Sequence, residues 1–201
     1  MLYYNPAEAF LNTPPFVLRH DLFSKIELNE IIEYGHNLNL IKAEVKTNKF
    51  KNSNDDVQEI DETIRVSEIA WVVFNNESKW FYDKIAMAID DLNLRFYQFD
   101  LHGFENMQFT VYDSKLSSKY DWHMDTLFGT AHDSFTRKLS ATLLLNDNFE
   151  GGNFEISRYS VPKMPAGSLI VFPSFMMHRV SPIIEGIRNS IVCWCVGPKF
   201  K

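Results

Sequence analysis

The sequence lacks a long apolar run. No stretch of about 18 or more apolar residues, the length of a membrane-spanning helix, occurs in it. The first ten residues, MLYYNPAEAF, also lack the basic and then apolar order of a secretory signal. We therefore expect a cytoplasmic protein with no membrane partner. With 201 residues, 45% of them apolar, the chain is long enough for one domain with a sizeable core.

Cysteine and basic charge are also scarce. The only cysteines, Cys193 and Cys195, stand two apart in an apolar stretch. In a strand they would share a face, which disfavours a disulfide between them, so we expect reduced core residues. The formal net charge is −6. This charge gives no general basic field for a phosphate backbone, so we do not expect nucleic acid as the partner.

The second half of the chain has the pattern of short strands. Aromatic residues are abundant, with 17 Phe, 8 Tyr and 4 Trp, and aromatic side chains pack well in a β-rich core. From Asn106 onward, the β-like runs are MQFTVY, KLSATLLLN, NFEIS, GSLIVF, MMHRVS and IRNSIVCWCV. Turn-forming clusters such as Gly151-Gly152 and Glu185-Gly186 separate these runs. Many short strands with frequent turns predict a sandwich or barrel.

Two helices are predicted in the first half. The first begins at Ser24, whose spacing to Glu27 fits a capping box, and its apolar stripe is Leu28, Ile31, Ile32 and Leu38. The second follows Asn75, Asn76 and Ser78, and its stripe is Phe81, Ile85, Ile89 and Leu92. Each stripe should pack against a larger element. Residues 42–62, between the helices, are polar and aperiodic and are predicted to form a mobile loop.

Three residues form a candidate metal site. His123 and Asp125 lie in YDWHMDT, and His178 lies far downstream in VFPSFMMHRVSP. In a strand, residues two apart point to the same side, so the first two can reach one ion. Two imidazoles and a carboxylate suit iron(II) and leave coordination positions open, unlike a closed four-ligand site. Alone the pattern is weak, because His-x-Asp arises often by chance and a lone strand histidine is more often structural.

Arg188 strengthens this interpretation. It follows His178 by ten residues with Glu185-Gly186 between them, so we expect the two on neighbouring antiparallel strands joined by a turn. Its planar guanidinium suits a carboxylate in a pocket, although a surface arginine is an equally ordinary interpretation. Ser190 would point the same way on the strand and offer a second donor.

Together these residues resemble the 2-oxoglutarate and iron(II)-dependent dioxygenases, in the prolyl 4-hydroxylase-like branch that includes PKHD-type hydroxylases. His123, Asp125, His178 and Arg188 match the family pattern, and Tyr120 gives the Tyr-x-x-His-x-Asp form. The stretches NDNFEGGNFEI and PAGSLIVFPSFMMH are also similar. The resemblance implies a mainly β fold with flanking helices, a double-stranded β-helix (jelly roll, cupin-like). In a single domain of residues 1–201, residues 106–201 would form the jelly-roll core, and 1–105 the helical support and outer strands.

The resemblance also implies the chemistry. His123, Asp125 and His178 would bind Fe(II), and Arg188, Tyr112 and Ser190 would bind 2-oxoglutarate. The products would be succinate, carbon dioxide and a hydroxylated C–H bond, with ascorbate as a candidate reductant. The carboxylate of Asp125 favours hydroxylation, because related halogenases have a small residue there. Leu143 departs from prolyl hydroxylases that carry a tyrosine on this strand, which leaves fewer donors for the co-substrate.

The substrate and two alternatives stay open. Peptidyl proline or lysine and free small molecules are all compatible with this branch, and Tyr120, His132, Arg65 and Trp71 are candidates for the substrate side. Nucleic-acid demethylases of the same superfamily carry two arginines further downstream, whereas only Arg179 and Arg188 follow His178 here. The other alternative is a non-catalytic jelly-roll binding or assembly module.

Overall fold

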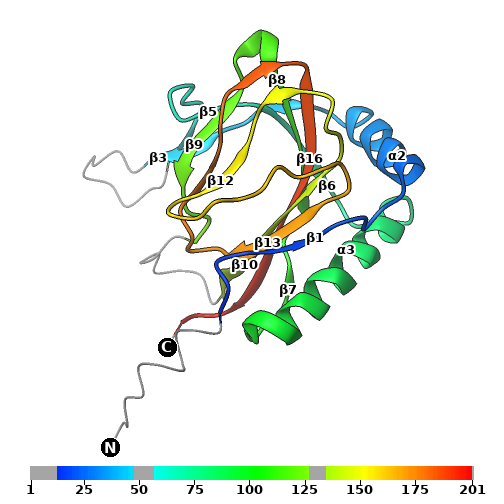
Figure 1. The fold of residues 1–201 in the computed structure, drawn as a ribbon, viewed down its shortest axis with the longest axis vertical. Helices are drawn as coiled ribbons and strands as arrows, with labels where there is room; N and C mark the ends of the chain where they lie inside the picture. The colour runs from blue at the N-terminus through cyan, green and yellow to red at the C-terminus, as the bar shows by residue number, and fades with distance from the viewer. Residues whose placement is uncertain (1–12, 48–56, 127–134, 201) are drawn as a thin grey trace, which may run out of the picture.

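Two facing β-sheets, with helices outside the larger one, make up the protein (Figure 1). The computed structural model describes residues 13–47, 57–126 and 135–200, without the side chains of 45–47 and 57–59. Within these ranges, no helix has the length and apolar character needed to cross a membrane. The predicted jelly roll, with two helices of the first half of the chain on one sheet, is confirmed.

The larger sheet has eight strands. In spatial order they are β1 (Val17–Arg19), β13 (Leu169–Pro173), β10 (Phe135–Leu144), β16 (Ile187–Pro198), β8 (Met107–Asp113), β6 (Glu68–Val72) and β2 (Ile41–Lys42), with β7 (Gly103–Phe104) also on β16. The smaller sheet has four strands. In order they are β12 (Phe154–Ile156), β14 (His178–Val180), β9 (Lys119–His123) and β5 (Arg65–Val66).

Strict alternation along the central strands separates two packing layers. On β10, Leu139, Ala141 and Leu143 are fully buried in the core that faces the helices. The intervening Ser140 and Thr142 are also buried, and Thr142 lines a cavity between the sheets. The same period of two runs along β16 and β8. Because side chains alternate across a strand, one face builds the core and the other is free to carry polar groups.

The two helices cover the outer face of the larger sheet (Figure 1). Helix α2 spans Lys25–His36. Ser24 is its N-cap, and the predicted capping box between Ser24 and Glu27 is present. Helix α3 spans Lys79–Leu92 and continues into a π-helical turn, Asn93–Tyr97. Its predicted stripe is buried in the outer core: Phe81, Ile85, Ile89 and Leu92.

Two local predictions are wrong. Residues 42–62 are not simply a loop, because β3 (Val45–Thr47) and β4 (Val57–Glu59) pair as antiparallel strands. The residues between these strands lie outside the described part of the chain. His178 and Arg188 are not on neighbouring strands either, since β14 belongs to the smaller sheet and β16 to the larger one. The intervening β15 (Ile183–Glu185) pairs with β11 (Glu150–Gly151) instead.

Candidate active site

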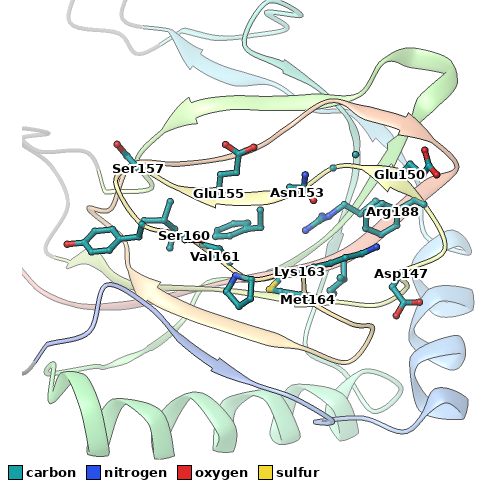
Figure 2. Close-up of a pocket in the computed structure, with 18 of the residues that line it drawn as sticks. Asp147, Glu150, Asn153, Glu155, Ser157, Ser160, Val161, Lys163, Met164 and Arg188 are labelled. Carbon is teal, nitrogen blue, oxygen red and sulfur yellow. The ribbon is translucent and has the colours of Figure 1, made fainter.

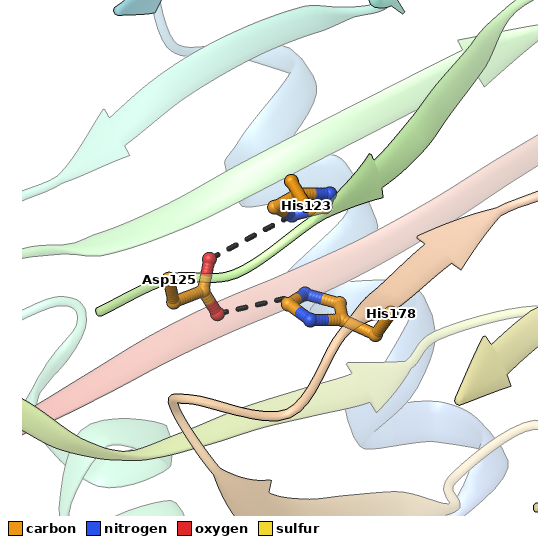
Figure 3. Close-up of side chains that lie close together, drawn as sticks. All are labelled: His123, Asp125 and His178. Atoms are coloured by element: carbon orange, nitrogen blue, oxygen red, sulfur yellow. Dashed lines mark ion pairs between the residues drawn. The ribbon is translucent and has the colours of Figure 1, made fainter. Parts of the chain in front are cut away.

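Three potential metal ligands converge between the sheets (Figure 3). His123 ends β9 and His178 begins β14, and these two residues are direct partners across the antiparallel pair. Asp125 Oδ1 lies 3.7 Å from His123 Nε2, and Asp125 Oδ2 lies 3.6 Å from His178 Nε2. The ligand atoms of all three residues lie within 4.8 Å of one another. The convergence expected from the sequence is therefore present.

Asp125 reaches this position in a different way from that expected. Strand β9 ends at His123, so Asp125 lies beyond the strand. Its backbone N–H donates to the carbonyl of Ser174, at 3.0 Å. Its carboxylate accepts a hydrogen bond from Ser140 Oγ, at 2.6 Å, and Ser140 Oγ is 2.9 Å from Ser174 Oγ. The carboxylate is thus oriented by the end of β13 and by the inner face of β10.

Backbone carbonyls set the orientation of both imidazoles. Nδ1 of His123 lies 2.7 Å from the carbonyl oxygen of Asp121, and Nδ1 of His178 lies 2.9 Å from that of Met176. A carbonyl can only accept, so each Nδ1 donates its proton, which leaves each Nε2 as the atom that can bind a metal. This is the arrangement in which second contacts fix the tautomer of a metal-binding histidine.

The electrostatics also favour a metal. Burial, and after it the neighbouring His178, lower the pKa of His123 to about 4, so the imidazole is neutral at pH 7. Burial by itself would raise the pKa of Asp125, but His178, His123, Arg137 and the Ser140 hydrogen bond outweigh it, and the net shift is downward. An ionised Asp125 carboxylate beside a neutral His123 imidazole is the donor state that a divalent cation requires.

A cavity of about 680 Å³ opens at this cluster. The three ligands and all three predicted co-substrate residues line it: Arg188, Ser190 and Tyr112. The side chain of Arg188 is 1% exposed, and its Nη1 donates to Ser190 Oγ at 3.0 Å. Its guanidinium carbon lies 5.4 Å from the centre of the Tyr112 ring. Tyr112 stands opposite Arg188 in the β8–β16 register, so the ring flanks the cation.

Arg188 has an unused donor. Among the described residues, its Nη2 is buried without a hydrogen-bond partner, and burial lowers the pKa of the guanidinium. Such a group is costly to bury unless a ligand completes it. The departure at Leu143, by contrast, has no bearing on this pocket. Leu143 faces the outer core, and the prediction that it removes a donor from the co-substrate pocket is wrong.

A second cavity, of about 1010 Å³, lies next to Arg188 (Figure 2). Residues 147 and 149–164 supply most of its wall. Trp122, Phe154 and Arg188 line both cavities. Arg188 therefore stands where the two spaces meet.

The predicted substrate-side residues have different positions. The Tyr120 ring stacks on the His123 imidazole with centres 3.5 Å apart, and burial raises the Tyr120 pKa to about 12. Arg65 is buried and places its guanidinium carbon 4.5 Å from the centre of the Tyr120 ring. Trp71 is 45% exposed, at the edge of the same cavity. His132 lies outside the described residues.

Sequence reasoning missed three polar residues of the site. Ser140 holds Asp125, Gln108 accepts a hydrogen bond from Arg65 Nη2 at 2.9 Å, and Arg137 lines the cavity. A signal for Ser140 exists, because it alternates with apolar residues in KLSATLLLN and must therefore lie on the opposite face of the strand. Gln108 shows the same alternation in MQFTVY.

Comparisons with known proteins agree with this geometry. Residues 107–196 match the family model of the 2OG-Fe(II) oxygenase superfamily. This part of the chain is similar to that superfamily. One relative is a PKHD-type hydroxylase of Synechococcus sp. (strain CC9902), 38% identical over 86 residues. The match covers 40% of this chain and only 37% of the length of that relative.

Solved structures show the same fold. A viral collagen prolyl hydroxylase from Paramecium Bursaria Chlorella virus-1, in complex with 2OG, superposes with a TM-score of 0.68 at 17% identity, over 92% of this chain and 97% of that chain. A prolyl hydroxylase from Trichoplax adhaerens, in complex with a peptide fragment of a hypoxia inducible factor, gives 0.66 at 18% identity, over 90% and 83%. At these identities the likeness supports the jelly-roll fold alone.

The residues present fit iron(II) and 2-oxoglutarate, the two groups that the name of the matching superfamily implies. Two Nε2 atoms and one carboxylate, with no fourth protein ligand among the described residues, suit iron(II) with open positions. The unpartnered Nη2 of Arg188, with Ser190 beside it, suits a carboxylate deep in the same cavity. The cavity is also large enough for a small dicarboxylate.

Proposed function

We propose that this protein is an iron(II)- and 2-oxoglutarate-dependent dioxygenase that hydroxylates a C–H bond, within one domain of residues 1–201. One observation carries the proposal: a His-Asp-His cluster, with His178 buried and the other two residues half-buried, and a buried arginine with an unpartnered donor line the same cavity. His123, Asp125 and His178 would hold the iron. Arg188, with Ser190 and Tyr112 beside it, would hold the distal carboxylate of 2-oxoglutarate.

The chain's own residues bind and orient the reactants. When bound, the iron supplies the oxidising chemistry that couples 2-oxoglutarate decarboxylation to insertion of oxygen into a C–H bond. Ser140 keeps one carboxylate oxygen of Asp125 hydrogen-bonded, which fixes the side chain. The stacked Tyr120 restrains rotation of the His123 ring. The apolar residues around Phe154 and Phe172, in the core between the sheets, exclude water from one wall of the site.

The primary substrate would bind at the open rim. Five large apolar side chains lining the cavity are exposed: Ile41, Trp71, Trp122, Met124 and Met177. Exposed aromatic groups around a catalytic cavity favour a substrate with apolar surface. The peptide complex of the Trichoplax adhaerens prolyl hydroxylase supports a peptidyl substrate, with proline or lysine as the first candidates. The cytoplasmic location and the use of ascorbate stay predictions.

The test is coupled product analysis. The protein is loaded with iron(II) and incubated with 2-oxoglutarate, oxygen and a host lysate, and mass spectrometry follows succinate and products heavier by one oxygen atom. We expect both in the wild-type protein and neither in His178→Ala or Asp125→Ala, because each removes a metal ligand. Lys42→Gln, which changes the rim of the same cavity at a residue paired with Glu62, serves as the matched control and should retain succinate formation.

Two other outcomes would point elsewhere. Tight iron binding without succinate would favour a non-catalytic jelly-roll module. Oxidation of methylated nucleic acid in place of a peptide or small molecule would favour a demethylase-like oxygenase.

A further inference from the structure

Arg65 is a second buried cation in the proposed catalytic cavity. Its side chain projects from β5, is 7% exposed, and lines the 680 Å³ cavity. Its Nε donates to Ser67 Oγ at 2.8 Å, and its Nη2 donates to Gln108 Oε1 at 2.9 Å. Its remaining contact is the face of the Tyr120 ring. All these partners are neutral.

Two other cations that line the cavity, Arg137 and Lys42, each have a carboxylate partner. Arg137 donates from Nε to Glu105 Oε1 at 2.8 Å, and Lys42 Nζ lies 3.3 Å from Glu62 Oε1. Within the described part of the chain, Arg65 and Arg188 are the cavity-lining cations that have no carboxylate partner. A buried charge without a counter-charge is unfavourable, so each of these two positions is suited to an anionic ligand.

Iron(II) and 2-oxoglutarate, the proposed reactants, supply an anionic partner for only one of these two arginines. The charges of iron(II) and Arg188 are matched by those of Asp125 and the 2-oxoglutarate dianion, while Arg137 is matched by Glu105. Arg65 therefore still lacks a carboxylate partner among the described residues when the metal and co-substrate are bound, since Glu44, the other carboxylate that lines the cavity, is exposed and is not paired with it. It lies beside the metal position, because the Tyr120 ring contacts both its guanidinium and the His123 imidazole.

We propose that Arg65 binds a carboxylate of the primary substrate, so that the oxidised molecule is itself anionic. This inference rests on the proposed function and narrows its substrate class. The carboxylate belongs either to a free α-carboxyl group or to an acidic side chain within a peptide. In both forms the guanidinium supplies charge-assisted hydrogen bonds that orient the substrate beside the iron.

Paired acid and amide probes test the site. The protein is loaded with Mn(II), saturated with 2-oxoglutarate, and titrated with N-acetylglycine or N-acetylglycinamide while NMR follows paramagnetic broadening of the acetyl methyl line. A Zn(II)-loaded sample is the diamagnetic control. A second pair consists of glutamate and glutamine, each with an acetylated amino group and an amidated α-carboxyl group. In this pair only the glutamate compound carries a carboxylate, and it lies on the side chain. Whichever acid is broadened identifies the source of the carboxylate.

We expect an acid to bind at least about tenfold more tightly than its amide. The reason is that the amide lacks the carboxylate and so loses roughly one charge-assisted contact with Arg65. Arg65→Gln should remove this preference and Arg65→Lys should keep part of it. Gln108→Met is the structural control, since it removes a neutral partner of Arg65 but leaves the charge. It should keep the preference for the acid even if it lowers the melting temperature.

Two results would overturn the proposal: equal binding of acid and amide in both pairs, or unchanged acid binding in Arg65→Gln. Failure of the proposed function is visible separately, as absence of Mn(II) broadening on the 2-oxoglutarate lines. The acid and amide comparison is then repeated without 2-oxoglutarate by saturation-transfer NMR, which needs no bound metal, and the same two results decide it.

Discussion

Replacing Arg188 by methionine should separate co-substrate binding from stability. The wild-type guanidinium is 1% exposed, donates to Ser190, and has a buried Nη2 without a partner in the described residues. Leaving such a donor unsatisfied costs about 1–3 kcal/mol, and methionine retains much of the apolar bulk. We therefore expect the free energy of unfolding of the ligand-free variant to stay the same or rise by about 1–2 kcal/mol. Urea denaturation measures this quantity.

The same substitution should greatly weaken 2-oxoglutarate binding. Removing one partner of a buried, hydrogen-bonded charge pair costs about 3–5 kcal/mol, which corresponds to a loss of affinity between about 150-fold and about 5000-fold. Calorimetry on the Mn(II)-loaded protein gives the dissociation constant directly. In turnover the apparent 2-oxoglutarate requirement should rise more than the maximal rate falls.

The opposite pair of results would refute this reasoning. If Arg188→Met lost about 2 kcal/mol of stability and bound 2-oxoglutarate within about fivefold of wild type, Arg188 would be a structural cation. Arg137→Met is the matched control in the same cavity. Its guanidinium is already paired with Glu105, so the variant should keep the 2-oxoglutarate affinity.

Two further predictions concern the metal ligands. Ser140→Ala removes the 2.6 Å hydrogen bond to Asp125 and should lower Mn(II) affinity about tenfold, measured by electron paramagnetic resonance; unchanged affinity would show that Ser140 does not orient the carboxylate. In the metal-free protein, burial holds the pKa of His123 at about 4, below its ordinary value of 6.5. Between these two pH values the unfolded state binds more protons than the folded state. The free energy of unfolding should therefore fall as the pH drops from 6.5 to 4. Thermal melts from pH 7 to pH 4 measure this dependence, and His123→Gln should flatten it.

The sequence predicts the periodic parts of the fold well. The capping box at Ser24 is local chemistry, and the apolar stripe of α3 is a local repeat, so both can be found without tertiary information. The strands after Met107 were recognisable for the same reason. The metal-ligand cluster could be predicted because a metal site requires particular residue types. Few other structural requirements would place His123, Asp125 and His178 in this pattern.

Features that depend on which sheet a strand joins could not be predicted. The spacing of His178 and Arg188 suggested one hairpin, but the short β15 pairs with β11 and separates the two residues onto opposite sheets. Leu143 was expected to face the pocket, although alternation from Thr142 places it in the outer core. The β3–β4 pair is too short and too polar to show a period of two in sequence.

The division into two layers explains how the larger sheet can host a polar site. Its outer face and the helices form the larger apolar cluster, with Phe81, Phe109 and Leu139 fully buried there. The stability contributed by that layer does not depend on the inner face. The inner positions can therefore carry groups such as Arg188 and Ser140, whose burial is unfavourable unless they are bonded. Substitutions of the outer apolar residues of β10 should accordingly lower stability, whereas substitutions of the inner polar residues Arg188 and Ser140 should lower ligand affinity.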